Sequence, residues 1–288
     1  MPERIEIIEV APRDGLQNEA TLVPVEAKLA FISALIAAGV TDVEATSFVS
    51  PRSVPQLADA DELLRLLPRD PGVRIHALVP NERGYDRAAA ADIDEVALFT
   101  SATETFCQAN IRCSIEESFD RFSPVVQRAK SDGRRVRGYL SVAFVCPFTG
   151  DVNPDAAAEL AIRLAAIGCD DVCLADTIGK ATPDQVAAVF ERLIGSIPVD
   201  HLSLHVHDTN GRAISNIGAA IDLEIRRFDS AAGGLGGCPF APGAPGNVAT
   251  ETVIRYVHER GFETGIDPTA VVRALDVIRP YVPRLATP

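Results

Sequence analysis

Short runs of apolar, β-branched residues alternate along this chain with longer segments rich in alanine and leucine. The junction between the two is repeated: a helix-like segment ends at a glycine or an acidic residue, and a strand-like run follows at once. Copies of this junction cover residues 37–46, 91–99 and 167–176, and a weaker copy covers residues 223–230. Glycine commonly ends a helix, and a run this short is typical of a parallel strand buried on both faces.

The pattern predicts eight strands that alternate with eight helices. The strands are expected near residues 4–10, 42–46, 74–79, 95–99, 136–142, 171–175, 201–206 and 227–230. The helices are expected near residues 24–38, 59–67, 82–91, 114–131, 154–167, 183–194, 213–222 and 250–260. Because the alternation has no repeated switch point, it favours a closed barrel over an open sheet. The expected fold is an α/β TIM (β/α)8 barrel.

No linker rich in glycine, serine or proline divides the chain, so residues 1–288 are expected to form a single barrel domain. A length of 288 residues, of which 47% are hydrophobic, is enough for one such core. Residues 267–288 follow the last predicted helix and are expected to form appended C-terminal helices.

Charge and the start of the chain argue against several classes of function. The net charge is −13, whereas general binding of nucleic acid needs a positive surface. No apolar stretch approaches the length of a membrane span, and the chain enters its first predicted strand without a signal or transit segment. The six cysteines form no CxxC pair and are expected to be reduced. These features predict a cytoplasmic protein with neither a nucleic-acid nor a membrane partner.

Unusual polar residues recur where the predicted strands end. In a barrel of this kind, the catalytic groups lie at the C-terminal ends of the strands and in the loops that follow. These positions hold Arg13, Asp14, Glu44, Asp176, His205 and His207, and a final loop rich in glycine and proline that contains Cys238 and leads to Asn247.

His205 and His207 are the most informative pair. Two positions apart on a strand, they share one face, so both can point into the mouth of the barrel. They are either ligands of one metal ion or a pair of structural histidines. Asp14 can add a carboxylate and Asn247 an amide oxygen, although Asp14 also suits a turn and Asn247 a helix N-cap. Such a set without a thiolate suits Mg²⁺ or Mn²⁺ better than structural zinc.

The remaining candidates also allow two interpretations. Glu44 and Asp176 are acids near strand ends, where a lone buried carboxylate costs several kcal/mol unless it is paired or bound to metal. Each is therefore expected to have a partner, such as Arg13 or Lys180. Cys238 is either a small apolar residue in a turn or a proton donor on a mobile lid.

Seven segments are similar to those of a known family. They are residues 9–19 (EVAPRDGLQNE), 46–51 (TSFVSP), 110–118 (NIRCSIEES), 176–179 (DTIG), 205–209 (HVHDT), 234–241 (GLGGCPFA) and 246–251 (GNVATE). Together they make the chain resemble 3-hydroxy-3-methylglutaryl-CoA lyase, one of the metal-dependent lyases and acyl synthases that share a barrel. The loop with the cysteine is the most specific, because condensing relatives do not normally carry it.

The resemblance implies a reaction and a set of roles. The reaction is cleavage of 3-hydroxy-3-methylglutaryl-CoA to acetyl-CoA and acetoacetate by a homo-oligomer, usually a homodimer. The implied metal ligands are Asp14, His205, His207 and Asn247. Arg13 would stabilise enolate charge, and Glu44 would support the metal. Asp176 would assist proton removal, and Cys238 would take part in proton transfer from the lid. Since an acyl-CoA is anionic, binding it to a chain of this charge requires a local group of arginines.

The chain departs from the family's usual pattern at two places. Asn210 stands where the family often has tyrosine, and residues 142–145 (VAFV) are more apolar than the family's usual run. Both follow barrel strands, so they bear on the acyl substituent more than on the reaction. The alternatives are a paralogue that acts on another 3-hydroxy-3-alkylglutaryl-CoA or hydroxyacyl-CoA, a Claisen-condensing synthase, a pyruvate-forming aldolase and a catalytically silent barrel.

Overall fold

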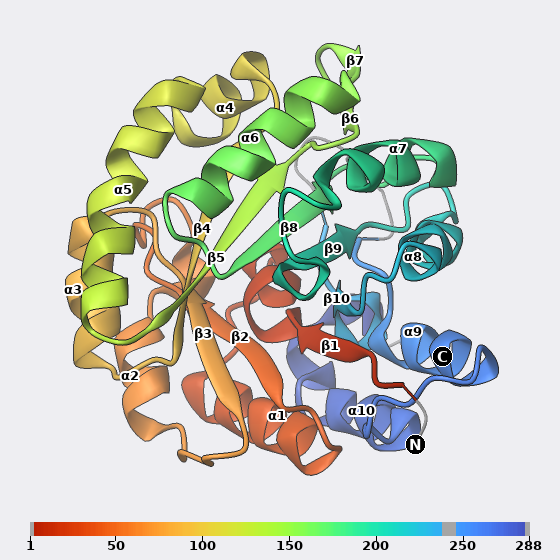
Figure 1. Ribbon diagram of the computed structural model, residues 1–288. Coiled ribbons are helices and arrows are strands. Elements are labelled where there is room, and N and C mark those ends of the chain that lie inside the picture. The colour runs from red at the N-terminus through yellow and green to blue at the C-terminus, as the bar shows by residue number, and fades with distance from the viewer. Residues whose placement is uncertain (1–2, 238–245, 286–288) are drawn as a thin grey trace.

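Eight parallel strands close into a barrel in the computed structural model of the chain, which describes residues 3–237 and 246–285 (Figure 1). The strands are β1 (Glu6–Glu9), β2 (Asp42–Ser47), β3 (Arg74–Leu78), β4 (Glu95–Ser101), β5 (Arg135–Ser141), β8 (Asp171–Asp176), β9 (Leu202–Val206) and β10 (Arg227–Ser230). The first strand closes the barrel by pairing with both β10 and β2. The predicted TIM barrel is confirmed, and all eight expected strands are present.

Helices surround the barrel on its outside (Figure 1). The eight predicted ones are α1 (Val25–Ala37), α2 (Ala60–Leu66), α3 (Glu82–Ala90), α5 (Ile115–Ser131), α6 (Pro154–Ala166), α7 (Pro183–Leu193), α8 (Ala213–Asp222) and α9 (Thr250–Glu259). Their buried faces pack on the strands and form one continuous hydrophobic cluster with them. This packing holds the strand ends, and therefore the loops that follow them, in fixed positions.

Several short elements were not expected from the sequence pattern. Helix α4 (Glu104–Ile111) begins where the side chain of Thr103 accepts a hydrogen bond from the N–H of Phe106, and it ends at Arg112, whose φ is 56°. A hairpin of β6 (Val145–Cys146) and β7 (Gly150–Asp151) follows β5. A single helical turn, Ala11–Gly15, follows β1. Elements this short are set by individual caps and turns, so they leave no periodic signal.

The C-terminal tail is helical, but it is not one helix. Helix α10 (Pro268–Ala274) packs against α1 and α9, and three single 3-10 turns continue the chain to Leu285. The N–H of Asp267 donates to the carbonyl of Ala38 at 2.8 Å, which fixes the start of the tail beside the end of α1. The predicted appended helices are therefore present as far as the described residues reach. Organisation of residues 1–288 as one domain stays a prediction.

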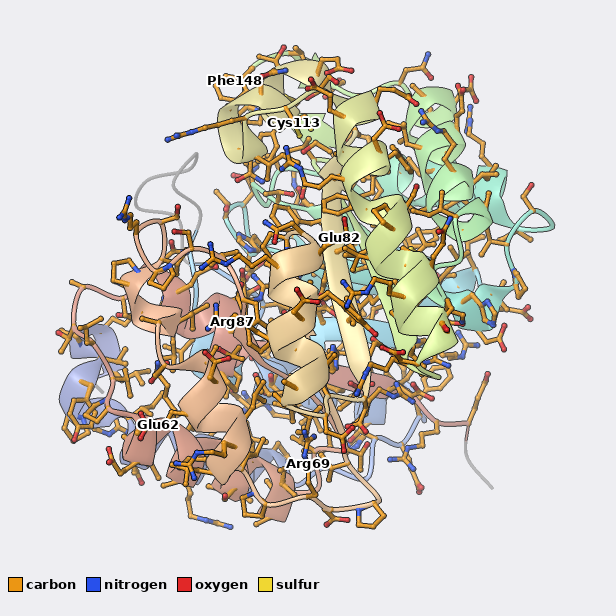
Figure 2. The ribbon with its side chains drawn as sticks, turned by 90° about the vertical axis from the view of Figure 1, so that its left-hand side faces the viewer. Glu62, Arg69, Glu82, Arg87, Cys113 and Phe148 are labelled. Atoms are coloured by element: carbon orange, nitrogen blue, oxygen red, sulfur yellow. The ribbon has the colours of Figure 1, made fainter. Side chains whose placement is uncertain are left out.

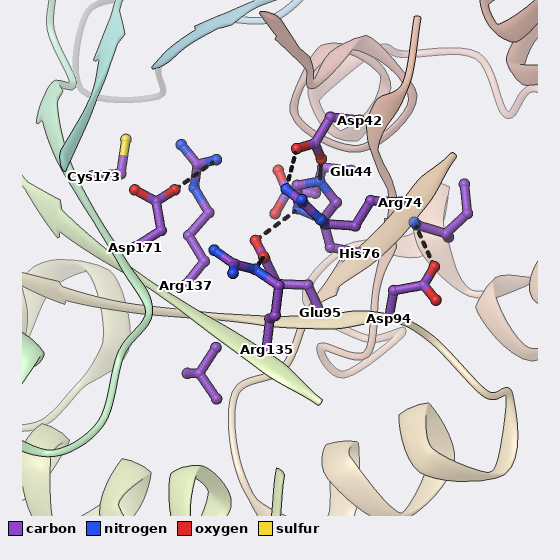
Figure 3. Close-up of polar contacts among 12 residues, drawn as sticks. Asp42, Glu44, Arg74, His76, Asp94, Glu95, Arg135, Arg137, Asp171 and Cys173 are labelled. Atoms are coloured by element: carbon purple, nitrogen blue, oxygen red, sulfur yellow. Dashed lines mark hydrogen bonds and ion pairs between the residues drawn. The ribbon is translucent and has the colours of Figure 1, made fainter. Parts of the chain in front are cut away.

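Charged side chains fill the barrel near the N-terminal ends of its strands (Figure 3). Arg137 and Asp171 are fully buried, with 3.2 Å between Nη1 and Oδ2. His76, also fully buried, is hydrogen-bonded to Asp42 and lies 3.7 Å from Glu95. Barrels of this type are usually filled with aliphatic side chains, and buried ions are tolerated when they are paired. The pairs join different strands, so the polar interior fixes how those strands lie relative to one another.

The expectations about membrane spans and about cysteines can both be compared with the described residues. Within them, no helix has both the length and the apolar character needed to cross a membrane. The cysteines described there are buried free thiols: Cys107, Cys113, Cys146, Cys169 and Cys173. The expected reduced state is confirmed for these five.

Candidate active site

A tight helical turn carries Arg13 and Asp14 from the end of β1 into the mouth of the barrel. The carbonyl of Val10 accepts hydrogen bonds from the N–H groups of Arg13, Asp14 and Gly15 at 3.1, 2.7 and 3.2 Å. A Cβ on Gly15 would lie 2.9 Å from the Cβ of Leu235. The turn is thus closed by one carbonyl and packed without room for a side chain at Gly15. It holds both charged side chains in buried positions.

Asp14, His205 and His207 meet at the floor of this mouth. Each offers one ligand atom, and these atoms all lie within 4.8 Å of one another. All three side chains are buried, and the imidazole centroids are 5.1 Å apart. Nδ1 of His205 is hydrogen-bonded to Asp229, which leaves Nε2 for a ligand. Nδ1 of His207 is buried and has no hydrogen-bond partner in the part of the chain that the structure describes.

Asn247, which follows the glycine-rich loop in the sequence, joins this group. Its Nδ2 donates to Oδ2 of Asp14 at 2.8 Å and to the carbonyl of Leu235 at 2.9 Å. Its Oδ1 is buried and has no partner among the described residues. Helix α9 is capped by Ala249 without a side-chain bond, so the N-cap interpretation of Asn247 is wrong. Gly236, with φ of 117°, is required here because its Cβ would lie 2.4 Å from Nδ2 of Asn247.

The charge states of the floor suit a cation. Burial by itself would raise the pKa of Asp14, but the charge of Arg13 and the bond from His207 outweigh it and hold that pKa below its usual range. Burial lowers the pKa of His207, which favours the neutral ring. An ionised carboxylate and a neutral imidazole are the forms that bind metal. Together with the partnerless Oδ1 of Asn247, they form a set of donors that fits a divalent cation.

Arg13 lies between two carboxylates. Its Nε donates to Oε2 of Glu44 at 2.7 Å, and its Nη1 donates to Oδ1 of Asp14 at 2.6 Å. Glu44 is fully buried and does not line the cavity, so it acts on the floor through Arg13. The predicted pairing of Glu44 with Arg13 is confirmed.

Asp176 lies behind the cavity wall. Its neighbours Ala175 and Thr177 line the cavity, and because side chains alternate along a strand, the carboxylate of Asp176 points away from it. Its oxygens accept hydrogen bonds from the backbone N–H groups of Lys180 and Ala181, each at 3.0 Å. Lys180, one of the partners expected for the buried acids, thus contacts Asp176 through its backbone N–H. Burial outweighs these bonds and raises the pKa of Asp176 to about 6.

Asp229, Arg137 and Tyr139 were not recognised in the sequence. Asp229 accepts from Nδ1 of His205 at 3.0 Å, from the hydroxyl of Tyr139 at 3.0 Å and from Nη2 of Arg137 at 2.5 Å. The sequence did contain one signal for these residues. Arg137 and Asp229 are charged residues inside predicted strands, at positions that face the interior of the barrel. It pointed to a buried partner but did not identify His205, which lies on another strand.

The floor opens into a cavity of about 780 Å³. Arg13, Asp14, His205 and His207 form its inner part. Most of the remaining lining residues come from the loops after β1, β2 and β3, from strands β4, β5 and β8, and from helices α4 and α5. Neither Asn210 nor residues 142–145 line it, so the two departures from the family pattern do not touch this space. Cys238 lies outside the described residues.

Comparison with known proteins agrees with this architecture. A family model described as HMGL-like matches residues 4–278. The hydroxymethylglutaryl-CoA lyase of Pseudomonas mevalonii is 48% identical, and the match covers 94% of this chain and 90% of that protein. The 3-hydroxy-3-methylglutaryl-CoA lyase of Danio rerio, named as cytoplasmic, is 46% identical over 96% of this chain and 83% of that protein.

Solved structures show the same likeness. The HMG-CoA lyase of Brucella melitensis superimposes with a TM-score of 0.94 at 49% identity, covering 96% of this chain and 98% of that one. An HMG-CoA lyase of Acinetobacter baumannii, solved in complex with coenzyme A and 3-methylmalate, gives a TM-score of 0.92 at 36% identity, covering 96% and 91% of the two chains. With this sequence match over nearly its whole length, the chain belongs to the HMGL-like family.

Proposed function

We propose that this protein is a divalent-metal-dependent carbon–carbon lyase that cleaves 3-hydroxy-3-methylglutaryl-CoA to acetyl-CoA and acetoacetate. The observation that carries the proposal is the cluster of Asp14, His205 and His207, buried at the floor of an open cavity with Arg13 beside it. Relatives that match this chain over most of its length are named for that activity. The chemistry of the cluster is consistent with it.

The metal is proposed to be Mg²⁺ or Mn²⁺, held by Asp14, His205, His207 and Asn247. Oxygen and imidazole ligands without thiolate favour these ions. The partnerless Oδ1 of Asn247 and the short separation of the three other ligand atoms support the assignment. When bound, such an ion supplies Lewis-acid chemistry, lowering the pKa of a hydroxyl group held against it.

The remaining catalytic roles are proposed for residues at or behind the floor of the cavity. Asp14, the only carboxylate among the described lining residues, accepts the C3 hydroxyl proton while the C2–C3 bond breaks. Asp176 assists from behind the wall, through its electrostatic interaction with His205. The electron pair of the broken bond moves into the thioester as an enolate. Arg13, which keeps its charge at all working pH values, stabilises that enolate.

Protonation of the enolate carbon gives the acetyl thioester, and Cys238 is the proposed donor. Glu44 is proposed to keep Arg13 in place, since it accepts hydrogen bonds from that guanidinium. Because Asn210 and residues 142–145 do not line the cavity, these two departures from the family pattern give no reason to replace the methyl-bearing substrate with a longer 3-alkyl homologue.

The same proposal extends to assembly and location. We infer a homodimer or a higher homo-oligomer in the cytoplasm, built from single-domain chains. The supports are the family likeness and the relatives named as cytoplasmic. Light scattering of the purified protein tests the first point, and a mass of one chain would contradict it. A single cooperative unfolding transition would support one domain.

The activity itself is tested with purified protein, Mg²⁺ or Mn²⁺ and a panel of 3-hydroxy-3-alkylglutaryl-CoA esters. We expect release of acetyl-CoA from the methyl-bearing ester, lost when a chelator is present. His205→Ala is the matched variant, because it should abolish metal binding together with turnover. Metal-dependent condensation in place of cleavage, or no acetyl-CoA from any ester, would overturn the proposal.

A further inference from the structure

Three consecutive backbone carbonyls, those of residues 235–237, each accept a hydrogen bond from a side chain of a different segment. The bonds run from Nδ2 of Asn247 to Leu235 at 2.9 Å, from Nη1 of Arg284 to Gly236 at 2.9 Å, and from Nδ2 of Asn18 to Gly237 at 2.8 Å. These three residues belong to no helix or strand. The path of their backbone is therefore fixed by side chains that lie outside it.

The first of these carbonyls orients the proposed metal ligand Asn247. Nδ2 of Asn247 donates to Leu235 and also to Oδ2 of Asp14, at 2.8 Å. With Nδ2 held by two acceptors, Oδ1 is the atom of this amide that is left for a ligand. A shift of the backbone at residues 235–237 would therefore change the orientation of a group at the floor of the cavity.

Arg284 reaches this backbone from the C-terminal tail. It lies in the last 3-10 turn, Pro283–Leu285, and its Nε is 3.1 Å from Oε1 of Glu19 in the loop after β1. The guanidinium group is thus placed between the carboxylate of Glu19 and the carbonyl of Gly236. Arginine suits this position, because it presents several donors in a rigid fork. Arg284 does not line the cavity, so it acts on the floor through the backbone that it holds.

Apolar contacts hold the tail against the same glycine-rich loop. Gly233 has a φ of 64°, and a Cβ there would lie 2.7 Å from Cδ1 of Leu275 and 3.4 Å from Cδ2 of Leu285. Both leucines belong to the tail, and Leu275 is buried. Arg284 is therefore supplied by an element that is packed on the loop.

We propose that Arg284 is a positioning residue of the metal site, which ties the C-terminal tail to the backbone that orients Asn247. This inference rests on the proposed function, because it takes Asn247 as a metal ligand. The tail follows the eighth strand and the eighth helix of the barrel. It thus has a part in the site although it lies outside the repeated strands and helices.

Calorimetric titration of the full-length protein with Mn²⁺ tests the proposal. Arg284→Met keeps a long side chain but removes its donors. It should weaken Mn²⁺ binding about three- to tenfold, less than the roughly 10- to 100-fold effect of losing a direct partner of a ligand. Arg284→Lys, which keeps a charged donor, should recover part of the lost affinity. A purely structural role would lower the free energy of unfolding and leave the Mn²⁺ affinity of the folded protein unchanged.

The matched control is Arg69→Met. The side chain of Arg69 is 38% exposed, against 35% for Arg284, and its Nη2 donates to the carbonyls of Ala91 and Asp92 at 2.5 and 2.6 Å. Arg69 precedes β3, and Figure 2 labels it at the end of the molecule opposite to Phe148, which follows β5. The control therefore removes the same charge and the same kind of contact far from the site, and it should leave Mn²⁺ affinity at the wild-type value.

Three results would overturn the inference and leave the proposed function standing. They are equal Mn²⁺ affinities in wild type and Arg284→Met, an equal loss in Arg69→Met, and a loss in Arg284→Lys as large as that in Arg284→Met. The titration involves no turnover, so absence of acetyl-CoA release from a wild-type protein that binds Mn²⁺ would count against the proposed reaction alone. A wild-type protein that binds no Mn²⁺ would overturn both.

Discussion

Nδ1 of His205 lies 3.0 Å from Oδ2 of Asp229, across two neighbouring barrel strands. Burial would raise the pKa of Asp229, but the charge of Arg137 and the bond from His205 hold that pKa below its usual range. An ionised Asp229 fixes the tautomer of His205 with its proton on Nδ1. Nε2 is then the nitrogen that carries a free lone pair toward the cavity, and a carboxylate behind a metal-binding histidine also makes the ring a better ligand.

Asp229→Asn should therefore weaken metal binding without removing a ligand. Loss of such a supporting carboxylate typically costs about 10- to 100-fold in metal affinity. Titration of Mn²⁺ by calorimetry measures the change, and the electron paramagnetic resonance signal of bound Mn²⁺ reports whether the ligand set is altered. Asp200→Asn, at the exposed start of the segment that leads into β9, is the control. Equal affinities in wild type and Asp229→Asn would contradict the role.

Replacement of Cys238 separates proton transfer from metal binding. If this thiol protonates the enolate, Cys238→Ala should lower kcat by about 10²- to 10⁴-fold, the usual contribution of a general acid. Metal content should stay at the wild-type level, because cysteine is not among the proposed ligands. Cys169→Ala, which removes a buried thiol beside Gly138, is the matched control. Wild-type turnover in Cys238→Ala would exclude this cysteine from the mechanism.

Gly15 is expected to tolerate no side chain. A Cβ there would lie 2.9 Å from Leu235 and 3.3 Å from Ala11, so Gly15→Ala must displace the turn that carries Asp14. We expect a loss of about 1–3 kcal/mol in the free energy of unfolding, as for other overpacked sites, together with weaker metal binding. Urea unfolding and Mn²⁺ titration measure both. Gly72→Ala, in an exposed turn with its nearest contact at 3.4 Å, should change neither quantity.

The barrel could be predicted from the sequence because its signals are local. Each strand is a short apolar run after a helix stop, and the histidine pair at 205 and 207 has the spacing that places two side chains on one face. The residues behind the site could not be identified in this way. Asp229 and Arg137 are 92 positions apart, and only closure of the barrel brings them together.

Local sequence signals also do not show where charged side chains gather, or which way a side chain at a strand end points. The arginines at 52, 112 and 121 gather at one opening although the chain is acidic, and no composition predicts where charges collect. Asp176 was placed at a strand end, but which face it takes depends on the register of the last residues of β8. That register directs Ala175 and Thr177 into the cavity and Asp176 away from it.

Glu9 makes stability depend on pH in a direction opposite to that of most carboxylates. It is fully buried at the end of β1, and its oxygens accept hydrogen bonds from the N–H groups of Ala11 and Ala232 and from the hydroxyl of Thr250, at 2.9, 3.0 and 2.7 Å. Burial outweighs these bonds and raises the pKa of Glu9 from 4.5 to about 7. The folded protein therefore holds a proton in a range where the unfolded chain has released it.

Because the folded-state pKa is the higher one, this contribution is complete below pH 4.5 and is lost as the pH rises toward 7. The loss amounts to roughly 3 kcal/mol over that range. Glu9→Gln should remove it, since the amide keeps an acceptor for Ala11 and Ala232 and can donate to Thr250, which then donates to Ser230. The unfolding free energy of wild type minus that of Glu9→Gln, measured in urea with a chelator present, should fall as pH rises. Glu259→Gln at the exposed end of α9 should show no such trend, and a flat difference for Glu9→Gln would mean that this carboxyl group titrates normally in the folded chain.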